Sequence, residues 1–290
     1  MQRTAMLWIR DGVLINRMPV NAVAFAVAAL VHADPKQSEK TNLTALVNFA
    51  FETSGISCAD KMRKFNAENF SLVSDVTAAA DYYNLLASKT ASECRYFDGA
   101  CELIRDLREL GVLNFITSAV EQAVLDTWTE TPQGKLLVPD LTEVLGKRSN
   151  NFNKGKDHFA FVRAQYGVER MFYVADAVAE ISTGAQFSSE FNISPIGFAH
   201  VITKEKVRQA HALVMDAYLG CACAKASSSR DGLALDEAGL FLPKQEALVK
   251  SLKHANAAHV VSGDAKQIMS VLADYLGICG VLQKRESSNG

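Results

Sequence analysis

Short apolar runs alternate along the chain with segments whose apolar residues recur every three or four positions. The apolar runs are typical of buried strands, and they lie at residues 5–9, 113–116, 171–175, 195–198 and 258–261. Helical periodicity occupies residues 99–110 and 156–166, and Gly111 stands where a helix C-cap glycine belongs. Strands that alternate with helices form right-handed βαβ units, so we expect an α/β fold with a three-layer, Rossmann-like parallel sheet.

Residues 16–92 show a different pattern, with helical periodicity and no strand-like run. Pro19 suits the first turn of a helix whose apolar residues run from Val20 to Val31. Two more helical patterns follow within this segment. The sequence therefore predicts an inserted helical cap domain at 16–92, an α/β core at 1–15 and 93–283, and a tail at 284–290.

A second insertion into the core is expected at about residues 203–245. It begins with a helical pattern that includes Val207 and Val214. Residues 233–242 could then form a hairpin around Glu237, Ala238 and Gly239. We interpret this insertion as a candidate surface for a protein partner or for self-association.

The charge balance narrows the classes of partner. The chain has 30 basic and 32 acidic residues, so no basic excess indicates nucleic-acid or membrane-surface binding. Its longest apolar stretch, residues 20–31, is far shorter than the ~20 residues that a bilayer span needs. We therefore expect a cytoplasmic protein that binds neither nucleic acid nor membrane.

Polar side chains follow several of the predicted strands. The residues that could carry chemistry there are Asp11, Thr117, Ser118, Lys154, Lys156, Asp176 and Glu180. Ligands of an open parallel sheet bind at the carboxyl ends of its strands, so these groups are expected to lie together. Carboxylates bind Mg²⁺, while hydroxyl and ammonium groups bind an anion. The histidines show no metal-ligand spacing, and His158 is expected on a helix surface.

Four segments in this order resemble the haloacid dehalogenase-like superfamily, in particular its capped phosphatases and phosphomutases. They are WIRDGVLIN with MPVNAVAF after it, then YFDGACELIRDLRELGVLNFITSA, and finally NKGKDHFAFVRAQYGVERMFYVADAVAEI. The resemblance covers roughly residues 6–199. It implies a phosphate-binding centre with Mg²⁺, held by residues from four motifs.

The resemblance assigns roles to individual positions. The first motif of the family is Asp-x-Asp-Gly, whose first Asp is the nucleophile and whose second is the general acid/base. These positions hold Ile9 and Asp11 here. Thr117 matches the hydroxyl of the second motif, with Ser118 as the next candidate, and Lys154 matches the lysine, with Lys156 as the alternative. Asp176 and Glu180 match the acids of the fourth motif and, with Asp11, are the expected metal ligands.

Ile9 is the most important departure from the family pattern. Isoleucine has no lone pair to attack phosphorus and no charge to bind a cation, so an aspartyl-phosphate cannot form there and any Mg²⁺ site is weak. Two hypotheses follow. The chain is a pseudoenzyme that binds a small phosphorylated or other anionic ligand, or a protein partner. Alternatively, it is a hydrolase with altered, Mg²⁺-dependent chemistry that uses Asp11.

Overall fold

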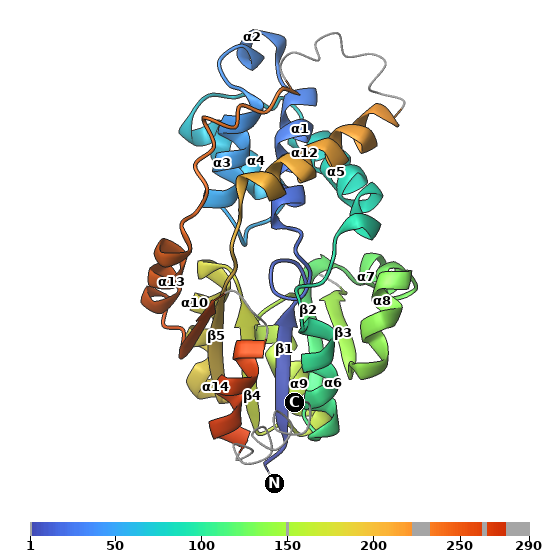
Figure 1. Ribbon diagram of the computed structural model, residues 1–290, viewed down its shortest axis with the longest axis vertical. Helices are drawn as coiled ribbons and strands as arrows, with labels where there is room; N and C mark the ends of the chain where they lie inside the picture. Colours follow the sequence, from blue (N-terminus) through green and yellow to red (C-terminus); the bar gives the residue numbers. More distant parts are fainter. Residues whose placement is uncertain (1, 149–150, 222–232, 263–265, 277–290) are drawn as a thin grey trace, which may run out of the picture.

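A six-stranded parallel sheet forms the core of the protein. The computed structural model describes residues 2–148, 151–221, 233–262 and 266–276, and within them the strand order is β3-β2-β1-β4-β5-β6 (Figure 1). The strands are β1 (Thr4–Ile9), β2 (Leu113–Glu121), β3 (Glu143–Lys147), β4 (Arg170–Ala175), β5 (Ile193–Ala199) and β6 (His259–Ser262). Every neighbouring pair is parallel. The α/β class and the parallel sheet predicted from the sequence are confirmed.

Burial explains why the sequence revealed five strands and missed β3. All six residues of β1 are buried, because the strand lies between β2 and β4 with layers of helices on both faces. Strand β3 lies at the sheet edge, is only partly buried, and has Glu143 and Lys147 at its ends. The side chain of Gln122 satisfies backbone groups of β3. Its Oε1 accepts from Gly146 N at 2.7 Å, and its Nε2 donates to Val144 O at 3.0 Å. A short half-polar edge strand therefore leaves no apolar run in the sequence.

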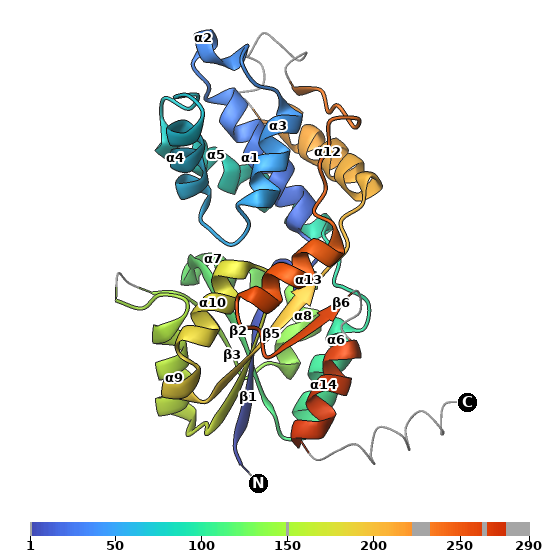
Figure 2. The ribbon, with the colours of Figure 1, turned by 90° about the vertical axis from the view of Figure 1, so that its left-hand side faces the viewer.

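Helices cover both faces of the sheet and complete the three layers (Figure 2). One face carries α6 (Ala100–Glu109) and α14 (Lys266–Leu276), and the other carries α9 (Lys156–Tyr166), α10 (Val178–Gln186) and α13 (Gln245–His254). Of the short helices, α7 (Gln122–Thr129) packs on β3, α8 (Pro132–Leu137) packs on α7 and α6, and α11 (Ser188–Phe191) packs on β5. Gly111, at φ 80°, follows α6 in the left-handed conformation expected after a helix C-terminus.

The segment between β1 and α6 forms a helical cap above the sheet (Figure 1). Its helices are α1 (Met18–Val31), α2 (Pro35–Ser38), α3 (Leu43–Glu52), α4 (Cys58–Glu68) and α5 (Val76–Lys89). Nearly every residue of α1 from Pro19 to Ala29 is buried, because α3, α5 and a further helix surround it. The apolar stretch at 20–31 is thus the central helix of the cap.

The second insertion also belongs to this cap. Helix α12 (Lys204–Leu219) packs on α1 and α5, although the sequence suggested a separate partner surface there. The chain at 233–244 then runs along the cap, where Asn48 Nδ2 donates to Gly239 O at 2.9 Å. The hairpin expected at 233–242 is wrong: only the turn forms, with Gly239 N donating to Asp236 O, and the flanking residues bond to α3. Residues 222–232 and the tail 284–290 lie outside the described ranges.

The cap stands over the carboxyl ends of the strands, as both ribbon views show (Figures 1 and 2). The loop between α3 and α4 reaches the core, since a Cβ added to Gly55 would lie 2.7 Å from Cβ of Ala177. No helix among the described residues is both long and apolar enough to cross a membrane.

Candidate functional site

The expected site residues gather where β1, β2 and β4 end beneath the cap. Ile9 ends β1 and pairs in register with Thr117 of β2. Asp176 directly follows β4. A Cβ added to Gly12, which has φ 95°, would lie 2.6 Å from Cγ of Asp176. The first and fourth predicted motifs are therefore in direct contact.

Ile9 is an aliphatic side chain inside the core. It is 5% exposed and belongs to the contiguous apolar cluster of the protein. The position at the end of the central strand therefore offers neither a nucleophile nor a cation ligand.

Asp11 is bound by arginines. The Arg10 guanidinium donates to both of its oxygens, at 2.8 and 3.1 Å, and Arg17 Nη1 lies 3.9 Å from Oδ2. Burial alone would raise the pKa of Asp11, but the charges of Arg10 and Arg17 and the hydrogen bonds from Arg10 hold it well below its ordinary value. Arg10 also stacks over the ring of Trp128, 5.3 Å from the ring centre. Asp11 is thus a weakly basic carboxylate that is ionised near neutral pH.

The hydroxyl of Thr117 is paired with a buried histidine. Thr117 Oγ1 lies 2.6 Å from His158 Nδ1, and His158 Nε2 lies 3.3 Å from Gly146 O. Burial lowers the pKa of His158 to about 4, despite the bond to Gly146, so the ring is neutral near pH 7. Nε2–H then donates to Gly146, and Thr117 donates to Nδ1. The expectation that His158 lies on a helix surface is wrong, because its side chain is fully buried.

The remaining candidates also have partners within the chain. Lys154 forms an ion pair with Glu180 from the first turn of α10, and both side chains are largely buried. Lys156 is exposed on α9 and pairs with Glu190 at 3.3 Å, away from the group around Asp11. Ser118 Oγ accepts from Val120 N at 3.2 Å. Of the two lysines considered, Lys154 is the one placed among the other site residues.

Asp176 is the exception among the candidates. Its side chain is 4% exposed, its Oδ2 has no hydrogen-bond partner, and His200 Nδ1 lies 3.9 Å from that oxygen. Burial and the neighbouring charge of Glu180 raise the pKa of Asp176 well above its ordinary value. Burial also lowers the pKa of His200 to about 4. The neutral imidazole of His200 therefore faces a buried carboxyl whose pKa is raised.

Asp176→Asn is expected to raise the free energy of unfolding near pH 7 by about 1–2 kcal/mol, because it removes a carboxylate that burial disfavours. The raised folded pKa makes this carboxyl destabilising above its unfolded pKa of 3.8, so the gain shrinks as the pH falls toward 4. Urea denaturation at both pH values measures the effect. Asp81→Asn, on the exposed side of α5, is the control. A variant no more stable than wild type near pH 7 would contradict the assignment.

The arrangement does not fit the Mg²⁺ site that the resemblance implies. Mg²⁺ takes near-octahedral oxygen ligands, normally including free carboxylates. Ile9 provides no oxygen, Asp11 is bound by Arg10, and Glu180 is bound by Lys154. Within the described ranges, no group of three or more His, Cys, Asp or Glu residues is placed to hold a metal ion. The expected ligands Asp11, Asp176 and Glu180 therefore do not form a cation site as they stand.

Three residues of this centre were missed by the sequence reasoning. Arg10 lies between two motif positions, and a cation beside an acid at a strand end is a signal for an ion pair. His200 follows β5 at the same sheet edge, so the rule applied to the other strands also pointed to it. Only the packing of α9 against β2 and β3 reveals His158.

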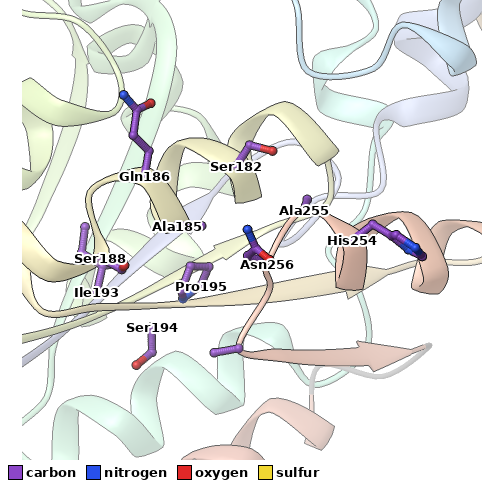
Figure 3. A pocket seen from close by; sticks show the side chains of 11 residues that line it. Ser182, Ala185, Gln186, Ser188, Ile193, Ser194, Pro195, His254, Ala255 and Asn256 are labelled. Atoms are coloured by element: carbon purple, nitrogen blue, oxygen red, sulfur yellow. The ribbon is translucent and has the colours of Figure 1, made fainter.

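An open hollow of about 650 Å³ lies elsewhere, between α10, the start of β5 and the turn after α13 (Figure 3). Its polar lining includes Ser182, Gln186, Ser194, His254 and Asn256. It opens beside the amino end of β5, whereas the motif residues lie at the carboxyl ends of the strands. This hollow is therefore separate from the candidate site.

Comparison with known proteins shows the fold. No family model matches the chain, and no curated protein matches it. A predicted phosphatase from Clostridium acetobutylicum has 13% identity and a TM-score of 0.57, covering 94% of this chain and 100% of that one. A HAD family hydrolase from Deinococcus radiodurans, with bound phosphate and sodium, has 16% identity and a TM-score of 0.55 over 94% and 96%. A putative haloacid dehalogenase-like hydrolase from Bacteroides fragilis has 12% identity and a TM-score of 0.53 over 72% and 93%.

These likenesses confirm the fold that the motifs suggested. The chain has the architecture of the capped haloacid dehalogenase-like hydrolases, including a cap over the carboxyl edge of a parallel sheet. At such low identities the likeness concerns the fold alone.

Proposed function

We propose that this hydrolase fold has lost phosphatase chemistry and acts as a pseudoenzyme that binds a small anionic ligand between its cap and its core. The observation that carries the proposal is the end of β1, where the buried Ile9 precedes an Asp11 bound by Arg10. No side chain at that strand end is free to form a bond to phosphorus. Covalent catalysis through an aspartyl-phosphate therefore lacks its nucleophile.

The other motif residues support the same conclusion. The Thr117 hydroxyl donates its hydrogen bond to His158 Nδ1, so it is not free to donate to a bound phosphate. The ammonium of Lys154 is neutralised by Glu180. A catalytic centre needs such groups preorganised toward the substrate, and here they are directed toward other protein groups.

Altered chemistry through Asp11 is the competing hypothesis, and the site offers it little support. A carboxylate whose pKa is held well below its ordinary value is a weak base and a weak nucleophile. Attack by Asp11 would also have to break two hydrogen bonds from a buried arginine. We therefore favour binding over catalysis.

A small ligand is also favoured over a protein partner that docks on residues 203–245. The apolar stripe of α12, which includes Val207, Val214 and Tyr218, is already buried within the cap. The exposed residues of α12 are mostly charged or polar, and Leu219 at its end is the one large hydrophobic side chain of this helix that is exposed.

Hydrolysis of p-nitrophenyl phosphate with Mg²⁺ tests the proposal directly. The purified protein is expected to release p-nitrophenol no faster than its Asp11→Asn variant, because no nucleophile is lost in that change. Comparing the two preparations controls for a contaminating phosphatase. Turnover by the wild type that disappears in Asp11→Asn would overturn the pseudoenzyme proposal in favour of altered chemistry.

A further inference from the structure

The second insertion ends in a segment that runs from the cap back to the core. Residues 233–244 lie along the cap and then lead down to the first residue of α13, as both ribbon views show (Figures 1 and 2). We call this segment the strap. In the described part of the chain, core and cap are joined at four crossings: residues 15–17 and 94–97 around the first insertion, and residues 200–203 and 241–244 around the second. The strap contains the last of these crossings.

Two polar residues of α3 bind the backbone of the strap. The Thr44 hydroxyl accepts from Asp236 N at 2.8 Å and donates to Asp236 O at 3.3 Å. The Asn48 side chain donates to Gly239 O at 2.9 Å and accepts from Phe241 N at 3.0 Å. The amide of Asn48 therefore bonds to the strap as the peptide group of a neighbouring parallel strand would. Together these bonds fix the position of the strap along α3.

Apolar side chains and α12 hold the same segment. Leu233 and Leu240 are buried and belong to the contiguous apolar cluster of the protein. From α12, Lys204 Nζ donates to Glu237 O at 2.6 Å, and His211 Nε2 lies 2.9 Å from Leu233 O. The strap is thus an integral part of the cap, bound by both α3 and α12.

The core end of the strap is anchored as well. Gln245, the first residue of α13, donates from its Nε2 to Ala199 O at 2.9 Å, and Ala199 is the last residue of β5. Helix α13 itself packs on β5 and β6. The chain that leaves the core after β5 and the chain that returns to it before α13 are therefore tied to each other at the sheet edge.

Core and cap are consequently joined at two separate places. At the first insertion, Asn16 N donates to Arg95 O and Phe97 N donates to Leu14 O, both at 2.9 Å, so these two crossings act as one joint. In Figure 1 the strap lies to the left of β1, and the chain between α5 and α6 lies to its right. A body held at one joint can turn about it in any direction, whereas a body held at two joints can only rock about the line between them.

We propose that the strap is a restraint that keeps the cap from turning away from the core, and that its bonds to Thr44 and Asn48 decide how far the cap can move. Without those bonds, residues 200–203 would be a single chain at the second joint, and a single chain can twist. With the strap bound to α3, the second joint resists twisting as well. This inference goes beyond the proposed function and does not depend on it, since it concerns the motion of the cap alone.

Single-molecule energy transfer between a dye on the cap and a dye on the core measures this motion. The dyes are attached through p-acetylphenylalanine in place of Ala67 on α4 and Ala164 on α9, because both residues are exposed and their helices lie on the same side of the molecule in Figure 2. The otherwise unchanged protein is expected to show one narrow distribution of transfer efficiency. Asn48→Ala is expected to broaden the distribution and shift it toward lower efficiency, and the combination with Thr44→Val is expected to do so further.

Asn66→Ala is the matched control for Asn48→Ala. The Asn66 side chain also donates to one backbone oxygen and accepts from one backbone N–H, at 2.9 and 3.1 Å, but both groups belong to Val73 within the cap. This variant is expected to keep the narrow distribution. Thr44→Val alone, which preserves the shape of the side chain, is a milder variant that keeps the proposal testable if Asn48→Ala does not fold.

Hydrogen exchange provides a second readout. The backbone amides of residues 233–244 are expected to exchange about fivefold faster in Asn48→Ala, as the loss of one hydrogen bond predicts, whereas those of α9 keep their wild-type rates. The proposal is overturned if the wild type already shows a broad distribution, if the double variant keeps the narrow one, or if Asn66→Ala broadens it as much as Asn48→Ala does. Faster exchange in the strap without broadening would also overturn it, because the strap would then bind the cap without restraining it.

Discussion

Asp11→Ala is expected to lower the free energy of unfolding by about 2–4 kcal/mol, because it leaves the guanidinium of Arg10 buried without its counter-ion. Arg10 is 6% exposed in its side chain and donates to both Asp11 oxygens, and Arg17 loses part of its compensation as well. Removing one partner of a buried ion pair lowers the free energy of unfolding far more than replacing both partners does. Urea denaturation near pH 7 measures the loss.

Asp60→Ala is a matched control for this change. Asp60 bonds to Arg63 at 2.7 Å, but both side chains are mostly exposed, so water replaces the lost partner.

The pH dependence of the Asp11→Ala effect gives a second check. A carboxyl whose folded pKa is depressed stabilises the protein above its unfolded pKa, so the gap between wild type and Asp11→Ala should narrow as the pH falls below about 4. A gap that is small near pH 7, or that does not change with pH, would argue against the ion pair.

Gly12→Ala is expected to lower the free energy of unfolding by about 3–4 kcal/mol, because Gly12 combines a left-handed backbone with a close approach to Asp176. Its φ is 95°, which side chains rarely adopt, and a new Cβ would overlap the carboxyl group of the buried Asp176. Thermal and urea unfolding of the variant measure the cost.

Gly111→Ala separates the two causes of this effect. Gly111 also has a positive φ, of 80°, but no atom lies within 4 Å of the added Cβ. Gly111→Ala is expected to lower the free energy of unfolding by only about 1 kcal/mol, because of backbone strain alone. If both variants are destabilised equally, the contact between Gly12 and Asp176 does not constrain the site.

The hydrophobic pattern was sufficient for most of the core. Strands buried on both faces, such as β1, leave unbroken apolar runs, and helix α9 begins and ends at the residues that its periodicity indicated. The edge strand β3 left no such run, because solvent and the Gln122 side chain cover one of its sides. The packing of α12 on α1 depends on residues far apart in the chain, so periodicity alone could not assign α12 to the cap.

The candidate site was predictable in its positions but not in its pairings. The ends of the strands indicated Asp11, Thr117 and Asp176, and the structure brings these residues together beneath the cap. The partners that occupy them come from other elements, with His158 on α9 and Glu180 on α10. Whether a polar residue is free or engaged is decided by three-dimensional packing. A family motif can therefore be recognisable in the sequence although its side chains bond to other protein groups.

The two-part cap also constrains the order in which the protein folds. Helix α1 is apolar on almost every side, and one of its faces is covered by α12, which follows nearly the whole core in the chain. During synthesis, α1 is made long before α12. The apolar face of α1 that α12 covers therefore stays exposed until α12 has been made. Contacts of such long sequence separation form slowly. Nascent chains that stop before α12 are therefore expected to be prone to aggregation and to depend on chaperones.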